Sequence, residues 1–557
     1  MERTQKVLLC ALNAKYIHSS LAPWYLLAGI AQYCVKEIRA ELLEATVNED
    51  ADDILNRIAV QNPDVVAFSC YIWNIQKVKE LIRKIKVSHP GTMVILGGPE
   101  VSYNTKEVLL NNPGVGYVIS GEGEKPLALL LNAIYIGDAE PDIPGVCYRK
   151  DTETIISAPF ISAEDPPDPY SEQYFKALNG RIAYLESSRG CPFSCAFCLS
   201  ERGNVRYFDL EEAKERILRL AKSGTKTVKL VDRTFNANRK RAYDLMSFLI
   251  QNAYTEIPEG VCFHFEIAGD LLDEDTISLL ASAPAGLIQL EIGLQSFNRK
   301  TLEAVNRKTD TGLIKRNIGK LLKKGNIHIH IDLIAGLPFE DIKSFAYSFN
   351  TAYALLPHML QLGFLKLLHG APMRENPEIY PCCYHKNAPY EVISTPWLPS
   401  HAVKLLHHTE DALNRLYNSG RFRRTLSYLL SRTGYTPFVF FQDCGNYLSA
   451  KKLNRIGLND FIALVYDYFI SLPNIEKAVL RDTMVCDFLS SNAGGKLPYA
   501  LQIPDPALRE VKKRLKNALG EHGVKRGFAL LYAEPRVVVA EYDKRNPVTG
   551  EYKLSFF

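Results

Sequence analysis

The octapeptide CPFSCAFC at residues 191–198 places three cysteines, Cys191, Cys195 and Cys198, at the spacing C-x3-C-x2-C. No fourth cysteine and no histidine follows closely in the sequence, whereas a structural zinc site is closed by four ligands. Three thiolates can instead hold a [4Fe–4S] cluster and leave one iron open for a substrate or cofactor. The number of cysteines therefore favours an iron–sulfur site. Two alternatives stay open: a zinc site completed by a cysteine distant in the sequence, and three cysteines that are close by chance.

The cysteines follow the first of six strand-like segments that alternate with helix-like segments. Polar residues gather where these segments end, which is typical of a partial (β/α)6 barrel with its chemistry at the carboxyl ends of the strands. We expect this core to span residues 179–375. The candidate strands lie at residues 182–188, 227–233, 262–270, 288–296, 328–338 and 361–370.

Residues 1–150 also alternate apolar runs with amphipathic segments, which predicts an α/β fold with a doubly wound parallel sheet. The five candidate strands lie at residues 7–12, 41–47, 65–71, 92–98 and 117–121. Residues 151–178 are rich in proline and acid and predict a linker. Residues 376–557 combine helical stretches with a hairpin near the end, which predicts a C-terminal mixed α+β domain.

The composition is that of a globular protein, with 47% hydrophobic and 23% charged residues in 557. The net charge of +4 does not by itself indicate a nucleic-acid partner. We find neither a signal peptide nor an apolar run of the roughly 18 to 20 residues that span a bilayer. The twelve cysteines are mostly scattered singly, as in proteins of a reducing compartment. We therefore expect a cytoplasmic protein without membrane contact.

The cysteine spacing, the position after a strand and the aromatic Phe197 resemble the signature of the radical S-adenosylmethionine (SAM) superfamily. The resemblance implies that the open iron chelates the amino and carboxylate groups of SAM. One electron from the reduced cluster then releases a 5′-deoxyadenosyl radical. It also implies an electron donor of the flavodoxin or ferredoxin type.

Two later stretches resemble the oxygen-independent coproporphyrinogen oxidase and methylthiotransferase branches of that superfamily. They are EIGLQSFNRKTLEAVNRKTD (291–310) and HIDLIAGLPFED (330–341). By this likeness Gln295 and Asp332 would bind the ribose hydroxyls, and Arg307 would pair with the SAM carboxylate. Glu266 would lie near the amino group, and the backbone of residues 336–338 would contact the adenine.

Each of these polar residues has a plainer alternative. Asp332 or Glu266 could be satisfied by a backbone amide at a strand end, and Arg307 could be a solvated helix residue. The GGE-like element that follows the second strand in the superfamily is missing, since the sequence there is LVDRTFNAN. Asp232 and Asn236 are weak candidates for its role.

The strand ends of the N-terminal segment carry small residues, which let a backbone approach a bulky ligand. They read FSC (68–70), LGGPE (96–100) and SGEGEKP (120–126), and together they resemble the cobalamin-binding domain of B12-dependent radical SAM enzymes. A degenerate nucleotide-binding domain and a purely structural domain remain alternatives. The resemblance makes these residues candidates for cobalamin binding: Ser69, Gly97, Gly98, Pro99, Gly121, Glu122 and Gly123.

The first loop of this segment departs from B12 proteins that ligate cobalt through the histidine of D-x-H-x-x-G. In LNAKYIHSSLAP no aspartate stands two residues before His18 and no glycine three residues after it. The SCYIWN loop would then cover the lower face of the corrin, with Tyr71, Trp73 or Asn74 nearest to cobalt. Trp73 could equally be a packing residue.

A radical-forming cofactor combined with a methyl carrier implies methyl transfer from methylcobalamin to an unactivated carbon, most simply of a small-molecule substrate. Cyclisation or rearrangement by the same cofactors and modification of RNA remain alternatives, and so does a non-catalytic cobalamin carrier. The basic run at 509–517 could contact phosphate, although such runs are usually solvated helix faces.

The region after the barrel resembles an uncharacterised domain of the DUF4080 type, which would close the barrel and shape the substrate pocket. The adjacent Cys382 and Cys383 could be thiols of that pocket or ordinary reduced cysteines. No catalytic residue is assigned from the sequence.

Overall fold

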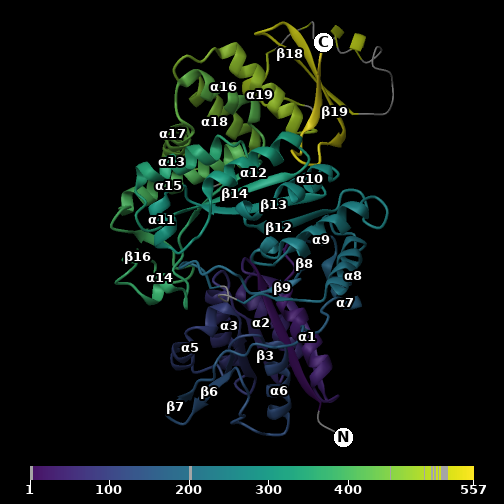
Figure 1. Cartoon of the computed structure of the whole chain (residues 1–557), viewed down its shortest axis with the longest axis vertical. Coiled ribbons are helices and arrows are strands. Elements are labelled where there is room, and N and C mark those ends of the chain that lie inside the picture. Colours follow the sequence, from purple (N-terminus) through teal and green to yellow (C-terminus); the bar gives the residue numbers. More distant parts are fainter. Residues whose placement is uncertain are drawn as a thin grey trace. The chain divides into compact units, whose positions relative to one another are not determined.

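The computed structural model, shown in Figure 1, describes residues 4–199, 204–451, 453, 455–494, 496–503, 506, 510–511, 513–515 and 525–557. The chain forms two compact units. The first comprises Met1–Ile267, Val305–Lys308 and Leu365–Ile393. The second comprises Ala268–Ala304, Thr309–Phe364 and Ser394–Phe557.

The first unit contains a seven-stranded sheet in the order β2-β1-β3-β4-β5-β6-β7. Strands β1 to β5 pair in parallel, in the order of a flavodoxin-like doubly wound sheet, which confirms the predicted fold. An antiparallel hairpin of β6 and β7 extends one edge and was not predicted. The strands are β1 (Gln5–Asn13), β2 (Ile38–Thr46), β3 (Val65–Ser69), β4 (Met93–Gly97), β5 (Tyr117–Ile119), β6 (Val146–Lys150) and β7 (Glu153–Ile155).

Alternate side chains of the central strands enter two separate cores. Leu8 and Phe68 pack with residues of α2 and α3, whereas Leu9 and Ala67 pack with residues of α1 and α6. Burial on both faces explains why these strands read as continuous apolar runs. The helices are α1 (Ala22–Tyr33), α2 (Ala51–Gln61), α3 (Ile75–Ser88), α4 (Pro99–Ser102), α5 (Thr105–Asn111) and α6 (Glu124–Tyr135).

The segment at residues 151–178 packs against this sheet domain. It contains α7 (Glu172–Leu178), which begins after Ser171, whose hydroxyl accepts a hydrogen bond from the Tyr174 amide. Tyr170 and Tyr174 are each only 1% exposed. The Tyr174 ring meets the ring of Trp24 edge to face, with 5.5 Å between the centroids. Buried aromatic rings therefore anchor a segment whose composition alone predicts a linker.

Three of the six predicted barrel strands lie in the first unit. β8 (Ala183–Leu185), β11 (Thr227–Leu230) and β12 (Cys262–Ile267) pair in parallel in that order. A short antiparallel ribbon of β9 (Ser188–Arg189) and β10 (Arg206–Tyr207) flanks the cysteine loop. The other elements of this region are α8 (Leu210–Ala221), η1 (Phe235–Ala237), α9 (Arg239–Gln251), α14 (Pro372–Glu375), β16 (Cys383–Tyr384) and β17 (Val392–Ser394).

The second unit holds the other three predicted strands. β13 (Ile288–Gln295), β14 (His328–Ala335) and β15 (Met359–Phe364) pair in parallel. All six strand predictions and the alternation of strands with helices are thus confirmed. The intervening elements are η2 (Gly269–Leu271), α10 (Glu274–Ser282), α11 (Arg299–Ala304), α12 (Thr311–Lys324) and α13 (Ile342–Tyr353).

The C-terminal part of the second unit is a mixed α+β region, as predicted. An antiparallel sheet is formed by β18 (Arg526–Leu531), β19 (Arg536–Arg545) and β20 (Tyr552–Phe556). Among the residues described in the structure, no helix has the length and apolar character needed to cross a membrane. The helices are α15 (Ser400–Leu413), η3 (Asn414–Asn418), α16 (Arg423–Thr433), α17 (Pro437–Ala450), α18 (Leu458–Ile470), α19 (Lys477–Ser491) and η4 (Tyr499–Leu501).

Candidate cluster and cofactor site

The loop that carries the three cysteines is held by backbone contacts within the first unit. The Ala196 amide donates to the Val305 carbonyl at 2.9 Å, and the Met373 amide donates to the Ala196 carbonyl at 3.0 Å. Gly190 precedes the first cysteine with φ of 98°, and a Cβ there would lie 2.2 Å from the Asn204 carbonyl oxygen. Only glycine fits this close approach, so the entry into the loop has a defined path.

The three thiols lie in one neighbourhood. Cys191 and Cys195 are 9% and 6% exposed. Burial raises the pKa of the Cys195 thiol, Arg307 opposes that rise, and the Cys198 and Cys191 thiols add to it. The Arg307 Nη1 lies 3.5 Å from the Cys195 sulfur, and the Cys191 sulfur lies 3.4 Å from Thr234 Oγ1. Neighbouring thiols, two of them buried and that of Cys198 half-buried, fit a cluster held by thiolates, which lose their protons on binding metal.

Phe197, between the last two cysteines, is half-buried. Asn306 supports the same loop, because its side-chain amide donates to the Ser194 carbonyl at 3.2 Å. The first unit therefore brings together the three cysteines, Phe197 and Arg307.

The stem of the cysteine loop, residues 187–190, is held by Asp232, which is 1% exposed. Its carboxylate accepts hydrogen bonds from the Ser187 amide at 3.0 Å and hydroxyl at 2.8 Å, and from the Ser188 hydroxyl at 2.5 Å. Burial raises the pKa of Asp232, and these donors oppose the rise. The carboxylate thus shapes the turn before the cysteines. Asn236, the other weak candidate from the sequence, is buried within η1.

Glu266 lies on β12 beside Lys229 of β11, with 3.2 Å between Nζ and Oε1. The Glu266 carboxylate is therefore paired with Lys229, a partner that the sequence did not predict. Nearby in the first unit, His18 Nδ1 lies 2.7 Å from the Tyr184 hydroxyl of β8. Burial, Lys15 and Lys229 lower the pKa of His18. The first loop of the N-terminal sheet is thereby tied to the first barrel strand.

The second unit brings together the other SAM candidates at the ends of neighbouring strands. Gly293 of β13 pairs with Asp332 of β14, and the register shifts before Gln295. Gln295 has φ of 73°, in the left-handed region that non-glycine residues seldom adopt. His330 Nε2 lies 3.0 Å from Asp332 Oδ1, and Gly336 follows the end of β14.

The backbone after β13 is held by a buried carboxyl, Glu340. Its Oε1 accepts from the Ser296 hydroxyl at 2.5 Å and from the Ser348 hydroxyl at 3.3 Å. Burial raises the pKa of Glu340 to about 7. Glu340 was not predicted from the sequence, although it stands two positions after the GLP stretch. Glu340 fixes the turn that follows Gln295.

The cobalamin candidates lie along one edge of the seven-stranded sheet, since Ser69 pairs with Gly97 in the β3–β4 register and Gly97 pairs with Ile119 in the β4–β5 register. Gly98 has φ of 99°, and a Cβ there would lie 2.7 Å from the Cys70 carbonyl oxygen. Internal packing thus accounts for this glycine. Pro99 begins α4, and Gly121 and Gly123 lie between β5 and α6.

The SCYIWN loop presents an aromatic pair. The Tyr71 and Trp73 rings stack with centroids 4.3 Å apart and planes 7° apart, and Trp73 is 49% exposed. Asn74 is 1% exposed and donates to the Ser69 carbonyl at 2.9 Å, while its Oδ1 accepts from the Tyr71 amide at 2.8 Å. Asn74 therefore holds the loop, and Tyr71 and Trp73 are its ligand-facing candidates.

The Glu122 carboxylate is occupied by two arginines that the sequence analysis did not identify. Arg189 Nη1 lies 2.7 Å from Glu122 Oε2, and Arg206 Nη2 lies 2.8 Å from the same oxygen. The sequence does show opposite charges at the two places, since the GEGE stretch is acidic and Arg189 stands two residues before Cys191.

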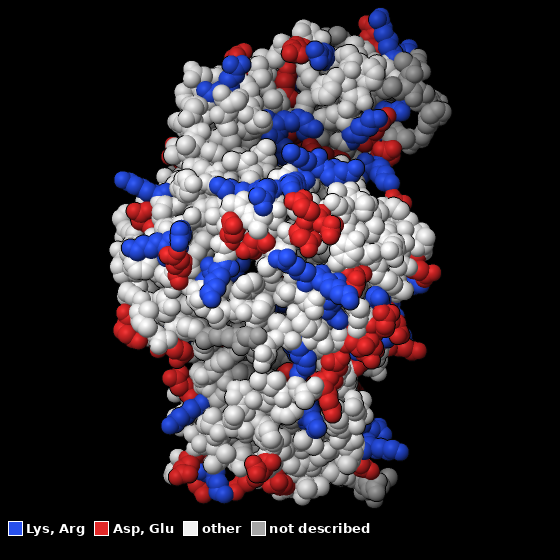
Figure 2. Space-filling model, viewed as in Figure 1, with Lys and Arg blue, Asp and Glu red and all other residues white. Residues whose placement is uncertain are grey.

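Cys382 and Cys383 lie in the first unit and are half-buried and exposed, respectively. All twelve cysteines fall in the described part of the chain, and none forms a disulfide. The basic run at 509–517 lies partly outside the described residues. On the face shown in Figure 2, basic and acidic side chains are interspersed.

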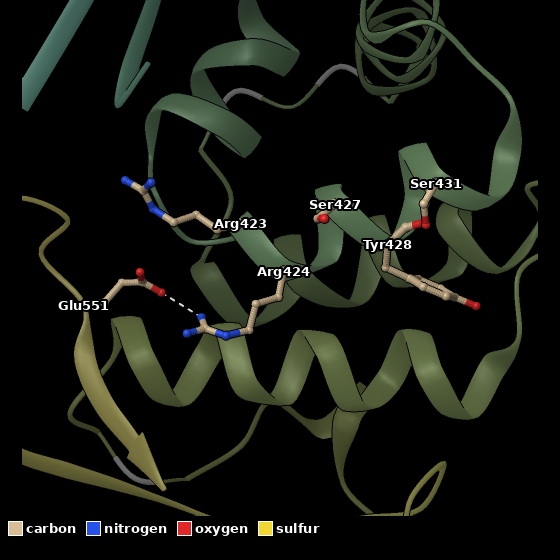
Figure 3. A pocket seen from close by; sticks show the side chains of 6 residues that line it. All are labelled: Arg423, Arg424, Ser427, Tyr428, Ser431 and Glu551. Atoms are coloured by element: carbon tan, nitrogen blue, oxygen red, sulfur yellow. Dashed lines mark hydrogen bonds and ion pairs between the residues drawn. The ribbon is translucent and has the colours of Figure 1, made fainter. Parts of the chain in front are cut away.

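A cavity of about 500 Å³ lies beside α16 in the second unit. Figure 3 shows that the Arg424 side chain points toward Glu551, with 2.7 Å between the charged atoms. None of the residues predicted to bind a cofactor lines it. The lining residues are Arg423, Arg424, Ser427, Tyr428, Ser431 and Glu551.

Comparison with known families matches three regions of the chain. Residues 8–131 match the B12 binding domain, residues 185–351 match the radical SAM superfamily, and residues 378–527 match a protein of unknown function, DUF4080. The three matches and their order are those that the sequence predicted: a B12 binding domain, a radical SAM region and a C-terminal DUF4080 region.

Two relatives carry names that describe methyl transfer. A 2-(S-pantetheinyl)-carbapenam-3-carboxylate methyltransferase from Streptantibioticus cattleyicolor is 29% identical over 51% of this chain and 44% of its own. The cobalamin-dependent radical SAM methyltransferase TokK from Streptomyces tokunonensis is 28% identical over 59% of this chain and 50% of its own. The chain thus spans about half the length of these relatives.

A solved structure supports the fold over most of the chain. The cobalamin-dependent SAM radical enzyme OxsB, determined with aqua-cobalamin and SAM bound, superposes with a TM-score of 0.59 at 15% identity. The superposition covers 93% of this chain and 81% of that one.

Proposed function

We propose that this protein is a cobalamin-dependent radical SAM enzyme that transfers a methyl group to an unactivated carbon of a small molecule. The observation that carries the proposal is the cluster loop, where three neighbouring thiols and Arg307 lie in the same unit as the edge of a B12-type sheet. The names of the two relatives support methyl transfer.

The residues present fit the implied groups. The Cys191, Cys195 and Cys198 thiols would hold a [4Fe–4S] cluster, with the fourth iron position left to SAM. When bound, the cluster supplies the electron that cleaves the sulfonium bond of SAM, and cobalamin supplies the methyl group that is transferred. An electron donor of the flavodoxin or ferredoxin type would reduce the cluster.

The chain's own residues would bind and orient SAM. Arg307 presents a guanidinium at the Cys195 sulfur and suits a carboxylate, while Glu266 already pairs with an ammonium group and suits an amine. Gln295 and Asp332 would form hydrogen bonds with the ribose hydroxyls. Phe197 and Gly336 are the further residues that the resemblance assigns to SAM binding.

Cobalamin would lie along the edge of the N-terminal sheet. The backbone from Gly97 to Pro99 and from Gly121 to Gly123 would follow the ligand together with Ser69. The stacked rings of Tyr71 and Trp73 would cover the lower face of the corrin. His18 Nδ1 is hydrogen-bonded to the Tyr184 hydroxyl. The absence of the D-x-H-x-x-G pattern around His18 supports cobalt binding without a histidine ligand.

Labelling with a deuterated methyl group tests methyl transfer directly. Extracts of a deletion strain and its parent are compared by mass for a compound that lacks one methylene in the deletion strain. We expect the purified, reduced protein to convert that compound with SAM carrying a deuterated methyl group, and the label to enter the product.

A product without label would contradict methyl transfer and favour cyclisation or rearrangement. A loss found only in digests of RNA would contradict the small-molecule substrate. Cys195→Ala, which removes one cluster thiol, should form no labelled product, and Cys34→Ala at the end of α1 is its matched control.

A further inference from the structure

The carboxylates of the GEGE stretch (121–124) point to the stem of the cluster loop. Arg189, two residues before Cys191, places Nη1 2.7 Å from Glu122 Oε2 and Nη2 2.6 Å from Glu124 Oε1. Its Nε lies 3.0 Å from Glu186 Oε1. One guanidinium thus joins two carboxylates of the N-terminal sheet domain to one at the end of the first barrel strand.

This ion cluster is largely shielded from water. The Arg189 side chain is 17% exposed, and those of Glu122 and Glu124 are 11% and 10% exposed. The guanidinium also lies over two aromatic rings, 5.2 Å from the centroid of Tyr25 and 5.9 Å from that of Phe208. Planar stacking combined with forked hydrogen bonding is a geometry that arginine can satisfy and lysine cannot.

A second arginine, Arg206, completes the ion cluster around Arg189. Arg206 on β10 is the antiparallel partner of Arg189 on β9, and its Nη2 lies 2.8 Å from Glu122 Oε2. The ion cluster therefore contains two guanidinium groups and three carboxylates, those of Glu122, Glu124 and Glu186. Removing one member leaves the others buried without compensation, so the cluster acts as a unit.

We propose that Arg189 is a positioning residue that fastens the stem of the cluster loop to the cobalamin-binding domain through Glu122 and Glu124. The inference rests on the proposed function, in which the loop holds the iron–sulfur cluster and the sheet domain holds cobalamin. It assigns the GEGE carboxylates to Arg189 and not to the cobalamin. Arg189 holds one side of the stem, and Asp232 holds the other through Ser187 and Ser188. Cys191 follows directly from a segment that is clamped on both sides.

The test measures the two cofactor sites separately in the full-length protein. Wild type and the variants Glu122→Gln, Arg189→Gln and Arg189→Lys are reconstituted anaerobically, and iron content and the electron paramagnetic resonance spectrum of the reduced cluster are recorded. Hydroxocobalamin affinity is measured by absorbance titration, and the melting temperature is measured without cofactors. Glu140→Gln is the matched control, since Glu140 forms an exposed ion pair with Lys150 in the same domain.

We expect Glu122→Gln and Arg189→Gln to bind hydroxocobalamin as wild type does, with an altered cluster spectrum and a loss of bound iron. Arg189→Lys should recover only part of the iron, and the double variant Glu122→Gln/Arg189→Gln should be no worse than Arg189→Gln alone. Glu140→Gln should match wild type in every measurement. Because Glu122→Gln leaves Arg189 its other two carboxylates, this variant keeps the test usable if Arg189→Gln fails to fold.

Two results would overturn the inference. One is a weakened hydroxocobalamin affinity of Glu122→Gln with an unchanged cluster spectrum, which would make Glu122 a cobalamin contact. The other is a Glu122→Gln variant equal to wild type in both sites. A wild-type protein that binds neither iron nor cobalamin would instead contradict the proposed function, and the inference with it.

Discussion

At the scale of single residues, Glu340 is a carboxyl group whose buried position has a measurable consequence. Its pKa is raised from the ordinary value of 4.5 to about 7, chiefly by burial, although hydrogen bonds from Ser296 and Ser348 oppose the rise. Within the described residues its Oε2 has no hydrogen-bond partner, as suits a protonated carboxyl. The folded protein therefore retains this proton over a pH range in which the unfolded chain releases it.

We predict that this group makes the protein less stable as the pH rises. Below the unfolded pKa both states are protonated, and no cost arises. Between pH 4.5 and about 7 the unfolded state ionises first, so folding loses up to about 3 kcal/mol, and the loss is complete above that range. Glu340→Gln stays neutral and should abolish this part of the pH dependence. Urea midpoints of the two proteins measured at about pH 5 and about pH 8 check the prediction, and an equal shift in both would contradict it.

Substitution of Gly98 tests whether the backbone packing at the proposed cobalamin site requires glycine. Alanine there must adopt φ of 99° with its Cβ 2.7 Å from the Cys70 carbonyl oxygen. We expect Gly98→Ala to lower the free energy of unfolding by about 1–2 kcal/mol or more. Gly91→Ala is the matched control, because no atom lies within 4 Å of a Cβ at that position. Equal denaturation midpoints for the two variants, measured without cofactors, would refute this account of Gly98.

Single residues differ in how far the sequence alone could predict them. The cysteine spacing is local, so eight residues were enough to predict the kind of site. Arg189 contacts Glu122 and Glu124 at separations of 67 and 65 residues, and no spacing rule covers such a pair. The strained backbone of Gln295 was likewise unpredictable, because the bulge before it depends on the pairing of β13 with β14.

At the scale of elements, α16 depends on a cap supplied by another helix. Asp487 of α19 accepts hydrogen bonds from the Arg424 amide at 3.1 Å and the Thr425 amide at 2.8 Å. The carboxylate is 2% exposed and also lies 3.2 Å from Arg424 Nη1. An acceptor from α19 thus satisfies amides at the start of α16, where a negative charge is also favoured by the helix dipole.

We predict that Asp487→Ala lowers the free energy of unfolding of the C-terminal region by about 1–3 kcal/mol, since the two amides at the start of α16 and the Thr425 hydroxyl lose their acceptor. Arg424 keeps its ion pair with Glu551 in this variant. Glu303→Ala is the control, because Glu303 belongs to an exposed pair with Arg299 and its loss should have no measurable effect. Chemical denaturation followed by circular dichroism compares them. Equal transitions would contradict the capping role.

Element prediction succeeded where periodicity was strong. The β–α alternation predicted all five parallel strands of the first sheet and all six barrel strands. It missed the β6–β7 hairpin and the β9–β10 ribbon, because strands of two to five residues leave too short a pattern. α16 begins at Arg423 with no side-chain cap of its own and gave no start signal in the sequence.

At the scale of the whole molecule, each region would have one role in the proposed reaction. The N-terminal sheet would carry the methyl donor, and the cysteine loop would generate the radical. The DUF4080 region includes residues of both units, and its segment at 378–393 belongs to the same unit as the cluster loop. The order of regions and the class of chemistry could be predicted from the sequence. The substrate could not, because no motif in the C-terminal region reports on it.

The three-cysteine loop is proposed to generate a radical from SAM, and the formation of 5′-deoxyadenosine by the reduced protein under anaerobic conditions reports this step. We predict that wild type and Cys34→Ala release 5′-deoxyadenosine, whereas Cys195→Ala binds little iron and releases none. Release by Cys195→Ala at the wild-type rate, or no release by a wild-type protein that holds its full complement of iron, would contradict the account.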